Sequence, residues 1–260
     1  MARLCPLFSG SAGNSYYVGN RSRGVLIDAG RSAKQLEGML RLCGIDPLAV
    51  EGVLVTHEHS DHVAGLRVFA KKFGLPVYGS QGTLEVLRQS LAGLTLRPVE
   101  QGMELGGMQV WSFPLSHDSA QPTGYRLRTG DGRVFALATD TGTLLEETLE
   151  GLWGADLAVV ESNHDKEMLR LGGYPLPLKR RILSERGHLS NEDCAGLLPR
   201  LLGAGTRRFL LAHLSHENNT PDLAYQAALG ALVQAGYVPE VDFLLKTAPP
   251  ENRTGKSFLF

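Results

Sequence analysis

Apolar and polar positions alternate with two different periods near the start of the chain. Short apolar runs separated by turns occupy residues 4–8, 15–18 and 24–28, which predicts a β-meander. A helix is expected next, because Ser32 can cap its start and the following apolar residues recur at helical spacing. Gly44 then predicts the end of this helix.

The rest of the chain interleaves strands with helices in both halves. Further strands are expected over residues 52–56, 75–78, 94–99, 108–114, 123–127, 134–139, 157–161 and 238–245. Helices are expected over residues 61–74 and 81–91, after the cap Ser190, and over residues 221–236. Pro199 is expected to kink or restart the helix that Ser190 caps. This order predicts the α/β class, with two sheets in a single domain over residues 1–260.

The densest group of polar residues is at positions 57–62, which read His-Glu-His-Ser-Asp-His between a predicted buried strand and a predicted helix. At the end of an extended segment, His57 and His59 leave the chain on the same side, so both rings can converge on one ion. Asp61 and His62 follow in the first helical turn and point toward a second position nearby. Imidazole and carboxylate ligands without cysteine suit a borderline cation such as Zn²⁺ or Mn²⁺. A solvated turn is the alternative, but it rarely combines three histidines and an aspartate at this spacing.

Single polar residues also follow three later strands. His117, Asp140 and His213 each come just after an apolar run. One ligand after another at the ends of buried strands is the pattern expected for a site on one edge of a sheet. With the motif at positions 57–62 they make seven candidate ligands, too many for one tetrahedral ion, so the sequence predicts two divalent ions. Asp28 ends an earlier buried strand in the same way, and its carboxylate should have a donor partner.

Two segments could bind a phosphate. The turn at residues 9–14 is rich in Ser, Gly and Asn and could bind an anion through its backbone N–H groups, although a tight hairpin is the simpler explanation. Residues 166–186, the basic segment, carry six cations against two carboxylates in a chain whose formal net charge is −1. A solvated helix face is one explanation, but a helix N-terminus with a nearby arginine binds phosphate well. The predicted phosphate ligands are Arg180, Arg181, Arg186, Ser190 and Asn191.

Composition limits the class of protein. The 260 residues are 43% hydrophobic and 20% charged, which fits a soluble globular protein with a sizeable core. The small net charge excludes a polycation, so any nucleic-acid contact must come from a local patch. Three cysteines without a C-x-x-C pair argue against a disulfide framework and favour a reducing cytoplasm. No apolar run reaches the length of a membrane span and residues 1–6 lack a signal-peptide core, so we expect a cytoplasmic protein without membrane contact.

The motif at positions 57–62, together with the strand-end ligands, resembles the metallo-β-lactamase-fold hydrolases, and the resemblance covers essentially the whole chain. It implies a four-layer αβ/βα sandwich, in which two mixed sheets pack face to face between helices and the metals lie at one edge. It also implies that Asp28 braces the metal loop. By the same resemblance the first ion is held by His57, His59 and His117, the second by Asp61, His62 and His213, and Asp140 bridges them.

Within that superfamily the chain is most similar to the YycJ/WalJ-like group. The similarity rests on residues 9–17, 161–165, 174–181, 186–191 and 213–219. It implies a bacterial cytoplasmic nuclease with 5′-to-3′ exonuclease activity on DNA.

A histidine assists the leaving group in the related tRNA 3′-processing enzymes, and His188 matches its position before a helix. The resemblance therefore implies that His188 acts outside the metal shell as a general acid, with Glu161 as a candidate carboxylate partner. His164 and His216 could lie behind the metal ligands or on the surface, and the sequence does not decide between these positions.

The chemistry expected of the metal site is hydrolysis. Two adjacent ions would share a hydroxide whose pKa falls from ~15.7 toward ~7, and this hydroxide could attack a phosphodiester at neutral pH. The same pair of ions could also hydrolyse a thioester or lactam carbonyl. The basic segment therefore favours a nucleic acid as the substrate. The resemblance favours DNA over RNA. The alternatives are a small-molecule metallo-hydrolase of thioester or cyclic phosphodiester type and a metal-bearing binding protein with little turnover.

Overall fold

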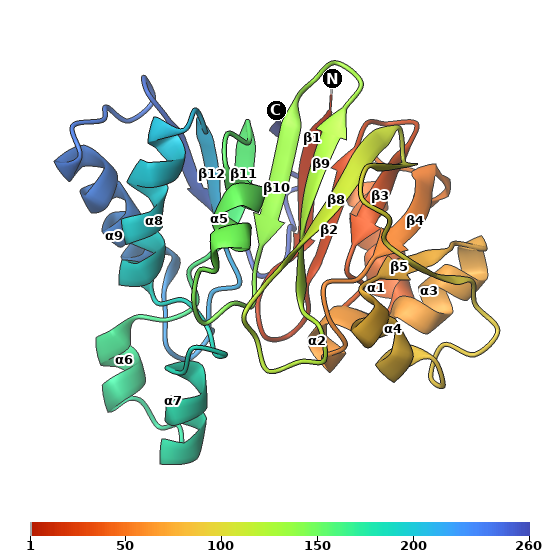
Figure 1. Ribbon diagram of the computed structural model, residues 1–260, viewed down its shortest axis with the longest axis horizontal. Helices are drawn as coiled ribbons and strands as arrows, with labels where there is room; N and C mark the ends of the chain where they lie inside the picture. Colours follow the sequence, from red (N-terminus) through yellow and green to blue (C-terminus); the bar gives the residue numbers. More distant parts are fainter. Residues whose placement is uncertain (1) are drawn as a thin grey trace.

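The strands form two mixed sheets that pack face to face, with helices on the outer face of each (Figure 1). This computed structural model describes residues 2–260. Its strands are β1 (Arg3–Phe8), β2 (Ser15–Gly19), β3 (Gly24–Ile27), β4 (Val50–Leu54), β5 (Val77–Gly79), β6 (Leu96–Pro98), β7 (Met103–Leu105), β8 (Met108–Pro114), β9 (Thr123–Thr129), β10 (Val134–Ala138), β11 (Leu157–Glu161), β12 (Arg208–Ala212), β13 (Leu244–Thr247) and β14 (Phe258–Leu259). The first sheet has the order β14-β1-β2-β3-β4-β5-β6, and the second has the order β13-β12-β11-β10-β9-β8-β7.

The helices lie between and after these strands. They are α1 (Ala33–Leu42), the 3₁₀ helix η1 (Pro47–Ala49), α2 (Ser60–Val63), α3 (Leu66–Phe73), α4 (Gln81–Leu87), α5 (Glu146–Leu152), α6 (Lys166–Leu171), α7 (Leu176–Ile182), α8 (Asn191–Gly203) and α9 (Pro221–Gln234). No helix in residues 2–260 is both long enough and apolar enough to cross a membrane.

Apolar side chains fill the space between the two sheets. Tyr16 and Ile27 from the first sheet meet Tyr125 and Leu137 from the second, and all four are fully buried. The hydroxyl of Tyr125 donates to the carbonyl oxygen of Val55 at 2.5 Å, which ties the sheets together. Burying each large apolar side chain contributes roughly 1.5–3 kcal/mol, so this layer is a main source of stability.

The outer helices cover the sheets with their apolar faces. α1 and α3 pack on the first sheet through residues such as Leu36 and Phe69. α5, α8 and α9 pack on the second sheet through Leu152, Leu198 and Leu232. The predicted four-layer αβ/βα sandwich is therefore confirmed.

Local signals place most helix starts correctly. Ser32 caps α1 and Ser190 caps α8, each in a capping box with the residue three positions later. Thr220 caps α9 by accepting a hydrogen bond from the backbone N–H of Leu223. α8 continues through Pro199, so the helix does not restart there. Its buried face against the second sheet and α9 holds the helix together at that position.

Two further element predictions are wrong. The single helix expected over residues 61–74 is divided into α2 and α3, because the N–H of Gly65 donates to the carbonyl oxygen of Ala29 at 2.9 Å instead of continuing the helix. The strand expected over residues 238–245 begins only at Leu244, since the chain before it turns through Glu240, whose φ is 61°. The sequence pattern does not predict β7, α5 or β14, which are short elements.

Candidate active site

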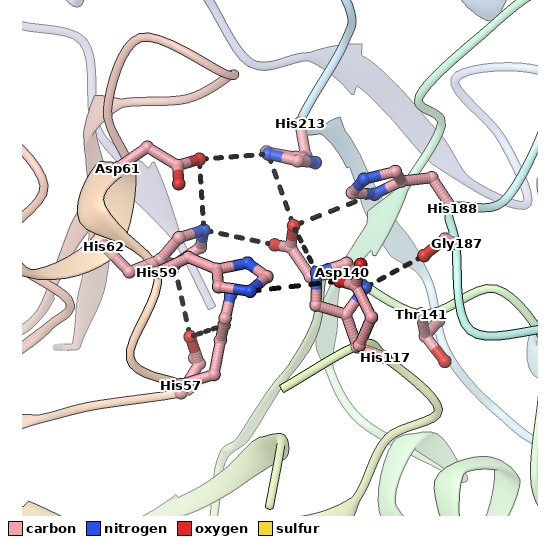
Figure 2. Close-up of polar contacts among 12 residues, drawn as sticks. His57, His59, Asp61, His62, His117, Asp140, Thr141, Gly187, His188 and His213 are labelled. Carbon is pink, nitrogen blue, oxygen red and sulfur yellow. Dashed lines mark hydrogen bonds and ion pairs between the residues drawn. The ribbon is translucent and has the colours of Figure 1, made fainter. Parts of the chain in front are cut away.

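Side chains at the carboxyl ends of strands from both sheets converge on one place. Asp28 follows β3, Asp140 follows β10 and His213 follows β12, while Glu161 is the last residue of β11. The β3–β4, β10–β11 and β11–β12 pairs are parallel, so these strands end at the same edge of their sheets. Figure 2 shows Asp140 and His213 at this edge, with the neighbouring histidines and Asp61 around them.

The backbone is left-handed at three of these strand ends. Asp28, Asp140 and His213 have φ angles of 59°, 64° and 57°. In the described part of the chain, residues 2–260, Glu240 is the only other non-glycine residue with a positive φ. Such a conformation costs on the order of 1 kcal/mol and persists where the surroundings hold it, typically at functional sites.

His57, His59 and His117 form the first group of candidate metal ligands. Their ligand nitrogens all lie within 4.8 Å of one another. The Nε2 atoms of His57 and His117 are buried and have no hydrogen-bond partner within residues 2–260. Nδ1 of His117 lies 3.0 Å from the carbonyl oxygen of Gly187, so Nδ1 carries the proton and Nε2 offers a lone pair. These nitrogens suit a divalent ion.

Asp61, His62 and His213 form the second group, also with ligand atoms within 4.8 Å of one another. Oδ2 of Asp61 lies 3.5 Å from Nε2 of His62 and 3.8 Å from Nε2 of His213. Nδ1 of His62 lies 2.8 Å from Oδ2 of Asp28, which directs Nε2 toward the group. Asp28 also accepts hydrogen bonds from the backbone N–H and hydroxyl of Thr56, both at 2.8 Å. The buried Asp28 therefore has the donor partners predicted for it, and it holds Thr56 and His62 in place.

Asp140 lies between the two groups (Figure 2). Its Oδ2 is 3.4 Å from Nε2 of His62, and its Oδ1 is 3.4 Å from Nε2 of His213 and 3.9 Å from Nε2 of His117. Oδ2 is buried and accepts no hydrogen bond from residues 2–260. A shared carboxylate among buried, unpartnered lone pairs is an arrangement that divalent cations satisfy. The seven predicted ligands thus lie together in one cluster that is able to bind metal.

Burial and nearby charges divide the histidines of this cluster into two kinds. Burial lowers the pKa of His57 and of His117, so both rings stay neutral and available as ligands. Burial also disfavours protonation of His62 and His213, but nearby carboxylates, Asp140 first, outweigh it. They raise the pKa of His62 well above its ordinary value and the pKa of His213 to about 10. Without metal, these two rings carry protons that a cation would displace.

We expect the metal-free protein to lose stability as the pH rises from about 7 to about 10. The pKa of His213 is about 10 in the folded protein and ~6.5 in an unfolded chain. Protonated His213 stabilises the folded state, and this stabilisation is complete when the pH is below the pKa of the unfolded chain. It is lost as the pH rises through the pKa of the folded protein. Thermal unfolding of chelator-treated and metal-loaded protein across this range checks the prediction. The loss should be smaller with metal, and equal slopes would contradict it.

His188 lies beside the cluster and is held by Glu161. Nδ1 of His188 and Nδ1 of His213 lie 2.9 Å and 2.8 Å from the same oxygen, Oε1 of Glu161. The other oxygen of Glu161 accepts the N–H groups of Leu189 and Thr141 at 3.1 Å and 3.0 Å. Burial opposes ionisation of Glu161, but His188 and His213 hold its pKa well below its ordinary value. The carboxylate therefore stays ionised and orients both rings.

Two of the predicted phosphate ligands are corrected by the structure. Ser190 is fully buried, and its hydroxyl donates to the carboxylate of Asp193 at 2.6 Å and accepts the N–H of the same residue at 3.1 Å. Asn191 is also buried, and its side chain bonds to Ser162 and Asn219. Helix capping and loop packing use these polar atoms, so neither side chain can bind a phosphate.

The three predicted arginines occupy different positions. Arg181 lines the cavity over the cluster and pairs with Asp118 at 3.0 Å, a partner that no sequence pattern signals. Arg186 donates to the carbonyl oxygen of His117 at 3.1 Å, so it positions that loop instead of facing a substrate. Arg180 is exposed and makes no ion pair within residues 2–260. Arg180 and Arg181 therefore remain as candidate phosphate ligands.

The two undecided histidines separate clearly. His164 is buried, and neither ring nitrogen has a hydrogen-bond partner in the described part of the chain. Its backbone pairs with Ser190, so it lies behind the His188 segment. The side chain of His216 is 90% exposed beside Glu217, which places it on the surface and not behind the metal ligands, the two positions that the sequence left open.

A cavity of about 200 Å³ opens over the cluster. Tyr174, Leu178 and Ile182, from α7 and the residues before it, form one wall of this cavity. These residues are not among those predicted for the site. Their spacing of four residues, which places them on one face of a helix, is the signal that could have found them.

The chain is similar to several known proteins. Residues 23–214 match the model of the beta-lactamase superfamily domain. The chain is 40% identical to the exodeoxyribonuclease YycJ of Bacillus anthracis over 256 residues, which cover 95% of this chain and 96% of that protein. It is 38% identical to the exodeoxyribonuclease WalJ of Streptococcus pneumoniae serotype 2 over 255 residues, covering 95% and 94%. The metallo-beta-lactamase fold protein YhfI from Bacillus subtilis superimposes with a TM-score of 0.72 at 17% identity, covering 99% of this chain and 98% of that one, which shows a shared fold.

Proposed function

The chain belongs to the beta-lactamase superfamily and is a metal-dependent hydrolase, and we propose that it is a nuclease that removes nucleotides from DNA in the 5′-to-3′ direction. Relatives similar over nearly their whole length are named exodeoxyribonucleases, which supports DNA as the substrate. Two divalent ions, Zn²⁺ or Mn²⁺, would be held by the seven clustered ligands. The observation that carries the proposal is the contact of His188 with Glu161 at 2.9 Å, which holds an imidazole beside that cluster where it could donate a proton. The single domain and the cytoplasmic location stay predictions.

Each part of the site has a separate task in this proposal. Divalent ions, when bound, lower the pKa of water to make a nucleophile and offset the charge of the phosphodiester. Glu161 accepts the Nδ1–H of His188, which leaves Nε2–H to protonate the departing oxygen. Glu161 is fully buried, so water does not compete for this bond. Arg181 offers its guanidinium to a phosphate from the cavity wall.

Digestion of end-labelled DNA and RNA, single- and double-stranded, with Zn²⁺ or Mn²⁺ tests the proposed function. We expect stepwise release of nucleotides from the 5′ end of DNA, and no release in the presence of a chelator. Cleavage of RNA alone, or only internal cleavage of DNA, would contradict the substrate or the direction. Hydrolysis of a thioester or a cyclic phosphodiester without cleavage of nucleic acid would favour the small-molecule alternative.

Reversing the charge of Arg180 should weaken DNA binding and leave the metal site intact. Arg180 is exposed, so its guanidinium can reach a phosphate without support from a neighbour. Arg180→Glu should lower DNA affinity and reduce the slope of log K against log salt concentration by about 1, measured by titration at several salt concentrations. Arg181 is a poor choice for this test, because its reversal would also break the ion pair with Asp118. Arg21→Glu, an exposed arginine between β2 and β3 that makes no ion pair within residues 2–260, is the matched control. Equal DNA affinities of the two variants would make Arg180 an ordinary solvated residue.

A further inference from the structure

A second, larger cavity lies next to the 200 Å³ cavity over the cluster of metal-ligand candidates (the metal cavity). It measures about 690 Å³ and shares the wall residues Ser11, Tyr174 and Ser215 with the metal cavity. Its other walls come from the turn at residues 9–13, the start of α9 and the segment 248–253. A group bound there would therefore adjoin whatever the metal cluster holds.

Hydrogen-bond donors without partners lie on one side of this cavity. The backbone N–H groups of Ser11 and Ala12 are in an exposed turn and donate no hydrogen bond within residues 2–260. The guanidinium of Arg31 forms no ion pair in the same residues, and its buried Nε has no acceptor. The Arg31 side chain is nevertheless held in place, because its Cζ lies 5.4 Å from the ring centre of Phe8. Its stem fills the space beside Gly13, where an added Cβ would lie 2.6 Å from Cδ of Arg31.

Arg31 is the unpaired charge of this cavity. Of the two acidic wall residues, Glu251 pairs with Arg253 at 3.0 Å and Glu217 lies 3.1 Å from Nδ1 of His216. Arginine with neighbouring backbone N–H groups is a combination that binds phosphate. The other walls combine the apolar side chains of Tyr174, Leu214, Pro221, Ala248 and Pro250 with uncharged polar residues such as Ser215 and Asn219. Tyr174 stands between both cavities, where an aromatic ring can stack on a base.

We infer that this cavity holds the 5′-terminal nucleotide of the DNA strand, with its terminal phosphate on Arg31 and the Ser11 and Ala12 N–H groups and its base against Tyr174. The inference rests on the proposed nuclease function and explains its direction. A 3′-terminal nucleotide ends in a hydroxyl and would leave Arg31 without an anion, whereas a 5′-phosphate supplies one.

The inferred position also accounts for repeated removal of nucleotides. With the terminal nucleotide in this cavity, the next phosphodiester lies in the metal cavity. Water adds its oxygen to phosphorus, the bond from phosphorus to the 3′-oxygen of the terminal nucleotide breaks, and that oxygen receives a proton from His188, which regains one from the water. The products are a 5′-mononucleotide and a strand that is one nucleotide shorter and again carries a 5′-phosphate.

Strands labelled at the 3′ end and carrying either a 5′-phosphate or a 5′-hydroxyl test this inference. The wild-type protein should degrade the phosphorylated strand about 10- to 100-fold faster, the range expected for charge-assisted hydrogen bonds. Arg31→Gln should bring this ratio close to 1, Arg31→Lys should keep part of it, and the remote Arg88→Gln should keep all of it. Metal content and the unfolding temperature of each variant show that it is folded. 5′-dAMP should inhibit the wild type, and deoxyadenosine should not.

Several outcomes would overturn the inference while the proposed function stands. These are equal wild-type rates on both ends, an Arg31→Gln variant that slows both substrates by the same factor, and equal inhibition by 5′-dAMP and deoxyadenosine. Failure of the proposed function gives a different result, because the wild type would then cleave neither strand.

Discussion

Asp140→Ala should remove bound metal and reduce DNA hydrolysis on the order of 10³-fold or more. Its carboxylate lies within 3.9 Å of ring nitrogens of His62, His117 and His213, so both candidate metal groups lose a shared ligand at once. Bound metal ions lower the activation free energy of hydrolysis by several kcal/mol, and each ~1.4 kcal/mol changes the rate tenfold. Elemental analysis, together with turnover of end-labelled DNA, measures both effects.

The matched control for Asp140→Ala is Asp131→Ala, because Asp131 is exposed in the turn before β10, at the end of that strand opposite to Asp140. This variant should keep the wild-type metal content and rate. The wild type should hold two ions per chain after purification with excess metal. Fewer than one ion per chain, or full activity of Asp140→Ala, would exclude the proposed two-ion site.

His188→Ala should keep both ions and the fold but reduce turnover of DNA by ~10²- to 10⁴-fold, the contribution typical of a positioned general acid. A departing alkoxide is a strong base and needs a proton. The ring of His188, which Glu161 holds in place, can donate this proton. A diester with a nitrophenolate leaving group needs no proton, so its hydrolysis should fall far less. Rates on the two substrates, with metal content measured in parallel, check the prediction.

Metal loss is the outcome to watch in His188→Ala. Ligand atoms of Asp140, Glu161, His188 and His213 also lie within 4.8 Å of one another, so His188 could instead belong to a metal shell. Loss of metal from the variant, or equal losses on the DNA and nitrophenyl substrates, would remove the general-acid role.

The sequence alone determined the α/β class of this protein and the positions of its candidate metal ligands. Burial along a strand or helix repeats with a fixed period, so the pattern shows where each element ends. His117, Asp140 and His213 could be predicted for that reason, since each is a polar residue shortly after a strand with buried apolar positions. The motif at positions 57–62 was found because its spacing is local.

Only the tertiary structure decided how the other polar residues are used. Arg181 and Asp118 are 63 positions apart in the chain, and their pairing decides that Arg181 borders the metal cavity. Ser190 has a hydroxyl group that could bind a phosphate, but the residue is buried and the hydroxyl caps α8. A hydrogen bond or ion pair depends on which distant residues folding brings within about 3 Å, and a periodic pattern of burial does not contain that information.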